Sequence, residues 1–159
     1  MDFISIREYF YKFYSALLLI LLVPIVAFIS LYLQPSRSQS DFERAPDTFV
    51  FFSATIIFLW TMMFILFNKK IKSLRNRQGL RSKLEKYFKL TIVRYIILSA
   101  AGMMLAVAFY FLRNDFFTIC FVMHLVITIL LWPTSPKVCR DLRLRGDERE
   151  MVYYKKDSL

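Results

Sequence analysis

The side chains best suited to chemistry in this sequence are Cys120 and His124, which stand four residues apart in an apolar stretch. On an α-helix this spacing places both on one face, as two ligands of one metal ion require. Two ligands are too few for zinc or haem, and a second copy of the chain would have to supply the rest. A neutral histidine hydrogen-bonded to a neighbouring helix is the favoured interpretation, so we expect no metal and no cofactor.

Proton-coupled or acid–base chemistry inside a membrane needs ionisable side chains within the spanning segments. This chain has four long apolar stretches without Asp, Glu, Lys or Arg, namely residues 13–33, 48–67, 95–112 and 116–132. Their composition argues against a proton-coupled exchanger and against a di-metal carboxylate site, and no catalytic sequence motif accompanies them. We therefore predict that the protein is not an enzyme. An enzyme acting on lipid would have to draw its acid–base groups from Asp115, Arg94 or the loops.

The same four stretches predict an all-α integral membrane protein with four transmembrane helices. They contain 21, 20, 18 and 17 residues, and 57% of the chain is hydrophobic. Because roughly 20 helical residues cross a hydrocarbon core of about 30 Å, each stretch is long enough for one span. None alternates apolar and polar residues as the strands of a membrane barrel do. We expect a four-helix transmembrane domain over 1–132 and a tail over 133–159.

The distribution of charge predicts how the spans are oriented. The net charge is +10, and residues 68–90 alone carry nine basic residues against one acidic residue, Glu85. Lys and Arg near the ends of spans stay on the cytoplasmic side, so we interpret 68–90 as a basic cytoplasmic loop. Two spans on either side of this loop then place both termini in the cytoplasm. Short external loops and the absence of a disulfide pattern favour a bacterial cytoplasmic (inner) membrane.

The basic residues beside the membrane are the candidate contacts for anionic lipid or for a partner protein. Each Lys or Arg close to an anionic leaflet gains about 1 kcal/mol. The simpler alternative is that these cations only fix the topology. No nucleic-acid-binding motif accompanies them, so we expect no nucleic-acid partner. The candidates are Lys69, Lys70, Lys72, Arg75, Arg77, Arg81, Lys83, Arg94, Arg140 and Arg143.

Small residues mark the third span as the helix that packs most closely against others, either within the chain or in a second copy of it in a homo-oligomer. Ser99, Gly102 and Ala106 recur at three- and four-residue spacing, and such small residues allow close approach of helices in lipid. The absence of Pro from Arg81 to Leu112 predicts that this helix extends into the cytoplasm by two to three turns. Gly79 is the expected break before it.

The tail is expected to contain one short amphipathic helix. Ser135 and Pro136 resemble an N-cap followed by Pro at the first helical position, and Gly146 is the expected terminator. In a helix from Pro136 to about Leu144, the apolar residues are expected to lie on the membrane surface. These residues are Val138, Cys139, Leu142 and Leu144.

Together these features predict a non-enzymatic accessory, assembly or scaffold subunit of a membrane. Its basic loop and tail would contact a membrane-protein partner or anionic lipid. The alternative is an oligomeric channel or carrier for a small or lipidic solute, in which Cys120 and His124 line a polar path between copies of the chain.

Overall fold

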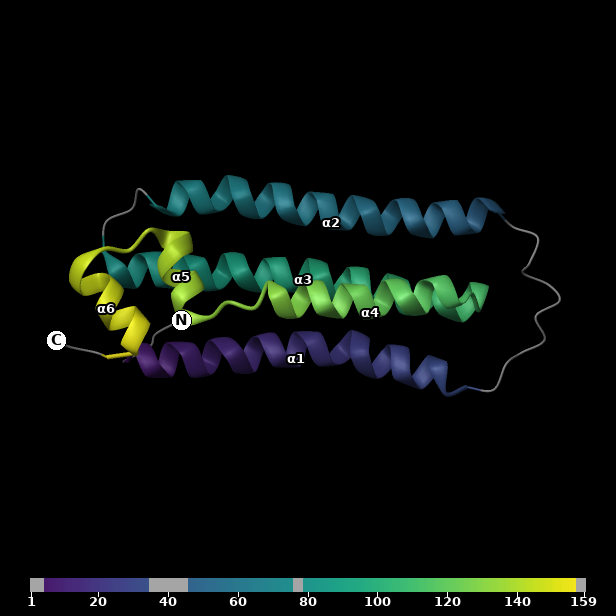
Figure 1. Ribbon diagram of the computed structural model, residues 1–159, viewed down its shortest axis with the longest axis horizontal. Helices are drawn as coiled ribbons and strands as arrows, with labels where there is room; N and C mark the ends of the chain where they lie inside the picture. The colour runs from purple at the N-terminus through teal and green to yellow at the C-terminus, as the bar shows by residue number, and fades with distance from the viewer. Residues whose placement is uncertain (1–4, 35–45, 76–78, 157–159) are drawn as a thin grey trace.

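The computed structural model describes residues 5–34, 46–75 and 79–156, and within these ranges all regular structure is helical. Four long helices run side by side, and two short ones lie at one end of them (Figure 1). The long helices are α1 (Ile6–Tyr32), α2 (Pro46–Arg75), α3 (Leu80–Leu112) and α4 (Asp115–Leu130). The short helices are α5 (Ser135–Leu142) and α6 (Gly146–Tyr154).

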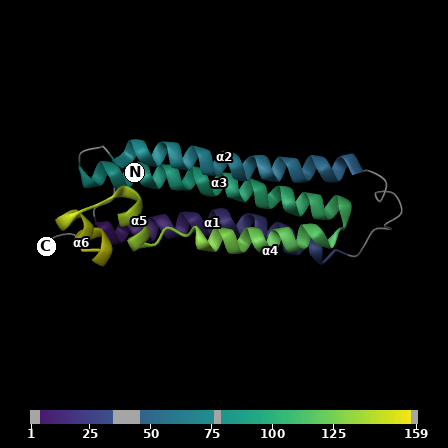
Figure 2. The same cartoon turned by 45° about the horizontal axis from the view of Figure 1, so that its top comes forward.

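One end of the bundle gathers most of the charged segments. Here α1 begins, α2 ends, α3 begins, and α5 and α6 lie across the long helices, as both views show (Figures 1 and 2). We call this the basic end. The long helices run alternately away from it and back, so that the start of α1 and the tail helices lie at the same end of the molecule.

Three of the long helices are long and apolar enough to cross a membrane, namely α1, α2 and α3. Helix α4 has 16 residues, or about 24 Å at 1.5 Å per residue, and meets the same test only together with α5, from which it is bent by 74°. The outer surface of the bundle is apolar: Leu19, Ile57 and Ile119 are all exposed. The chain is therefore a helical integral membrane protein with three candidate spans, or four if the bent pair is one span.

The expected loop over 68–90 is mostly helical. Helix α2 continues to Arg75 and α3 begins at Leu80, because Lys, Arg, Leu and Glu are good helix formers and no Pro interrupts either segment. The predicted break at Gly79 is confirmed, with a φ of 86° that favours glycine. Residues 80–94, which precede the third apolar stretch, are helical and continuous with it in α3.

The tail differs from its prediction in three ways. Helix α5 has Thr134 rather than Ser135 as its N-cap, and its C-cap is Arg143 rather than Gly146, which instead begins a second helix, α6. The apolar side chains expected on the membrane surface are buried in the core at the basic end, among them Val138 and Leu142. The sharp turn after α4 directs α5 onto the bundle, where it contacts α2 and α6.

Helix α3 is central, since it packs against α1, α2 and α4. A Cβ atom placed on Gly102 would lie 3.0 Å from the Cβ atom of Pro24 in α1 and 3.3 Å from the Nε2 atom of His124 in α4. Only a residue without a side chain fits between these groups without displacing them. Ala106, one turn further along α3, is fully buried. The small residues of α3 therefore face neighbouring helices, as the sequence predicts.

The Ser99 side chain compensates for a hydrogen bond that Pro24 removes from α1. Proline has no N–H, so the carbonyl of Ile20, four residues earlier in α1, loses its usual helical donor. The Ser99 hydroxyl of α3 donates a hydrogen bond to this carbonyl at 3.1 Å. In lipid no water would replace that donor, so the pair joins α1 to α3 at the point where α1 is weakened.

This pairing predicts a coupling between two substitutions. Ser99→Ala should destabilise the protein by about 1 kcal/mol, because the Ile20 carbonyl loses its donor. In a Pro24→Ala background the new N–H can bond to Ile20, so the same change should cost close to nothing. Unfolding in mixed micelles, followed by circular dichroism, measures the four variants. Thr55→Val is the control, because the Thr55 hydroxyl donates to the Phe51 carbonyl within its own helix. Equal costs in both backgrounds would contradict the coupling.

Candidate functional site

His124, the residue with the clearest chemical potential, is buried among the helices. It is 1% exposed, and its Nδ1 atom accepts a hydrogen bond of 3.2 Å from the Trp60 indole of α2. An Nδ1 atom that accepts a bond carries no proton, so this imidazole is neutral with its proton on Nε2. The favoured interpretation of His124 as a neutral group bonded to a neighbouring helix agrees with this geometry.

The same region contains a second bond between helices. The Thr128 hydroxyl donates to the His124 carbonyl at 2.8 Å within α4, and the Tyr95 hydroxyl of α3 donates to the Thr128 carbonyl at 3.3 Å. Cys120 is a free, half-buried thiol one turn before His124. Within the described ranges no group of three or more His, Cys, Asp and Glu side chains gathers in a way that could hold a metal. The polar groups around His124 thus join helices to one another.

The ten basic candidates fall into separate groups. Arg77 lies outside the described residues. Three others make contacts inside the protein. Arg94 is 6% exposed, and its guanidinium lies 4.2 Å from the centre of the Phe67 ring. Arg75 donates to the Asp141 carbonyl at 3.0 Å, and Lys83 forms a 2.9 Å ion pair with Glu148. The burial of Arg94 differs from the surface role expected for it. The exposed candidates are Lys69, Lys70, Lys72, Arg81, Arg140 and Arg143.

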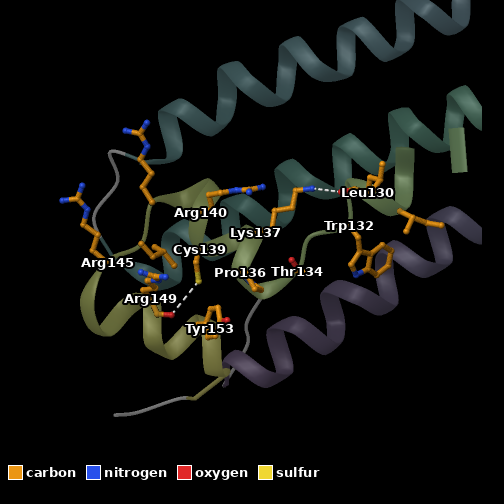
Figure 3. A pocket seen from close by; sticks show the side chains of 13 residues that line it. Leu130, Trp132, Thr134, Pro136, Lys137, Cys139, Arg140, Arg145, Arg149 and Tyr153 are labelled. Carbon is orange, nitrogen blue, oxygen red and sulfur yellow. Dashed lines mark hydrogen bonds between the residues drawn. The ribbon is translucent and has the colours of Figure 1, made fainter. Parts of the chain in front are cut away.

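Two of the exposed candidates line a pocket at the basic end, beneath the last turn of α4 (Figure 3). The pocket has a volume of about 870 Å³ and lies between the end of α4 and the two tail helices. Its basic residues are Lys137, Arg140, Arg143, Arg145 and Arg149. Its other lining residues are Ile129, Leu130, Trp132, Thr134, Pro136, Cys139, Leu144 and Tyr153. No described acidic residue is part of this lining.

The basic residues of the pocket come from two elements that the chain folds together. Lys137 and Arg140 are three residues apart on α5, Arg143 follows as its αL C-cap, and Arg149 is on α6. The Lys137 ammonium donates to the Leu130 carbonyl at 3.0 Å, near the end of α4. Burial lowers the pKa of the Lys137 ammonium, and the positive charges of Arg94 and Arg140 lower it further, whereas the Asp141 carboxylate opposes them. Lys137 and Arg140 are therefore close enough to repel each other.

The pocket is held in place by bonds between the tail and the long helices. The Tyr87 hydroxyl of α3 donates to the Asp141 carboxylate at 3.1 Å, and Arg75 bonds the backbone of the same residue. The Lys83–Glu148 ion pair joins α3 to α6, and Val152 of α6 is fully buried. The tail is thus a folded part of the protein that keeps the basic residues in fixed positions.

The sequence indicates Arg140 and Arg143 as contacts but does not indicate the pocket that they line. The three-residue spacing of Lys137, Arg140 and Arg143 was a usable signal, because it places cations along one side of a helix. The contribution of Arg149 depends on α6 folding back onto α5, which no local pattern indicates.

No known protein-family model, curated protein or solved structure matches this chain. The function is therefore argued from the geometry of the chain itself.

Tyr87→Phe tests whether the bond to Asp141 holds the tail helices in place. Losing a hydrogen bond to a carboxylate should cost about 1–2 kcal/mol and loosen α5 and α6 locally. Hydrogen–deuterium exchange should become about five- to thirtyfold faster across residues 135–154, with little change in α1. Tyr154→Phe is the matched control, because Tyr154 is exposed. Unchanged exchange in the tail of the Tyr87 variant would show that other contacts position it.

Proposed function

We propose that this chain is a non-catalytic accessory, assembly or scaffold protein of a membrane, which binds anionic lipid or a partner protein at its basic end. The observation that carries the proposal is the folded state of that end. Two tail helices pack onto α2 and α3 through buried apolar side chains, the Tyr87–Asp141 bond and the Lys83–Glu148 ion pair. Because the tail is folded onto the long helices, the exposed cations of this end have a stable support, as a binding surface requires. Cations that served only to fix the topology would need no such support.

The same end of the bundle is proposed to face the cytoplasm. All ten lysines fall in segments at this end, from Lys12 in the first turns of α1 to Lys156 after α6. Cations near the ends of spans are retained on the cytoplasmic side, which would place both termini there as well. In a bacterial cell this arrangement corresponds to the inner membrane, with the basic end against an anionic leaflet.

The interior of the bundle supports a binding role rather than a catalytic one. Its apolar stretches contain no charged residue, and several of its polar side chains bond helices together: Trp60 to His124, Ser99 to Ile20 and Tyr95 to Thr128. An oligomeric channel along Cys120 and His124 would require these helices to separate, because His124 is buried within a single chain. Binding at the basic end is therefore the proposal that we retain.

Native purification in polymer-bounded membrane discs tests the binding role. The wild-type chain should be enriched in a stoichiometric partner protein or in anionic lipid relative to the bulk membrane. Replacing Lys69, Lys70 and Lys72 by Gln should reduce that enrichment at least threefold, because three exposed cations are lost. Mass spectrometry of the co-purified proteins and lipids measures both quantities.

The control for this experiment is Arg113→Gln, which removes a cation at the opposite end of the bundle and should leave the enrichment unchanged. A wild-type chain that purifies alone, in lipid of bulk composition and with no response to the lysine substitutions, would overturn the proposed function.

A further inference from the structure

We propose that the pocket beneath α4 is a binding site for a single anionic phospholipid. The phosphate of the head group would lie among the basic residues, and an acyl chain would run along the end of α4 toward the bilayer. This inference rests on the proposed function, because it requires the basic end to lie against an anionic leaflet. It goes further by assigning one site, one class of ligand and the residues that recognise it.

The short length of α4 provides the space for the ligand. Helix α4 ends at Leu130 after 16 residues, whereas α3 extends over 33 residues beside it. Below Leu130 the chain turns by 74° into α5, and the pocket lies at this turn, between the end of α4 and the tail helices. Its volume of about 870 Å³ is within the range of about 300–1,000 Å³ that is common for small-molecule sites.

The charge of the pocket points to a phosphate group. Four arginines and one lysine line it, and the lining includes no described carboxylate. Figure 3 shows Lys137 and Arg140 of α5 side by side, with Arg149 of α6 below them, whereas Arg145 extends outward at the far edge. Planar guanidinium groups match the oxygens of a phosphate through paired hydrogen bonds. A bound anion would also relieve the repulsion between the Lys137 and Arg140 charges.

The apolar part of the pocket distinguishes a lipid from a soluble anion. Ile129 and Leu130 are 69% and 72% exposed at the end of α4 and also line the pocket. Trp132 lies next to them and stacks on Tyr14 of α1, with 5.8 Å between ring centres. Such an aromatic residue between apolar and charged surfaces is typical of the membrane interface. The continuous apolar and basic lining matches an amphiphile with one phosphate.

Native mass spectrometry of the purified chain in detergent tests the assignment. Titration with phosphatidylglycerol should give one tightly bound lipid per chain, with at least tenfold weaker binding of phosphatidylcholine. A triple variant, Arg140→Gln, Arg143→Gln and Arg145→Gln, should bind phosphatidylglycerol at least tenfold more weakly. Lys69→Gln, Lys70→Gln and Lys72→Gln form the comparison variant, which removes the same charge at the same end outside the pocket and should weaken binding only about threefold, the general effect expected of that surface.

Fluorescence supplies a second measurement that reports position. Brominated phosphatidylglycerol should quench Trp132 more than brominated phosphatidylcholine does, with Trp132→Phe used to subtract the signal of Trp60. Equal affinity for both lipids, or equal loss in both triple variants, would overturn the assignment to this pocket. Displacement of the lipid by millimolar glycerol phosphate would overturn it in favour of a soluble anion.

The outcomes separate this inference from the function on which it rests. If the pocket variant binds lipid normally while the Lys69, Lys70 and Lys72 variant loses its partner or lipid enrichment, the proposed function stands and the pocket assignment fails. If neither the native enrichment nor lipid binding by the purified chain is detected, both fail.

Discussion

A backbone carbonyl without a partner inside a bilayer has no water to bond to, and Pro24 creates such a carbonyl at Ile20. The Ser99 hydroxyl supplies the missing donor from α3. One turn along α3, the absence of a side chain at Gly102 lets the Pro24 ring and the His124 imidazole approach closely. Three helices therefore meet beside Pro24, where α3 supplies both the replacement donor and the space for close packing.

The lack of water inside a bilayer also determines where the polar and charged groups of the chain lie. Inside the bundle, Trp60 and Tyr95 bond to α4 from neighbouring helices. Charged side chains instead gather at the basic end, where α2 and α3 continue beyond the apolar stretches and the tail packs against them. The short α4 leaves room there for a pocket with five basic residues. The proposed lipid site thus follows from the lengths of the helices as much as from their charges.

Much of this architecture is predictable from the sequence, because apolar length determines a helix in lipid with little help from tertiary contacts. The helices around three of the apolar stretches follow from this length. The break follows instead from the conformational freedom of Gly79, and the packing face of α3 follows from its small residues. Helix α6 does not, since Val152 is its one buried residue and no apolar periodicity marks it. The burial of Arg94 against Phe67 and the Tyr87–Asp141 bond depend on segments distant in sequence, so local patterns could not indicate them.

The side of the membrane on which the basic end lies is the central claim, and lysine labelling in intact cells tests it most directly. A membrane-impermeant amine reagent, followed by peptide mass spectrometry, reports on all ten lysines. The account predicts that Lys72, Lys89 and Lys156 react only after the membrane is permeabilised. Modification of Lys72 in intact cells, at the level reached after permeabilisation, would contradict it.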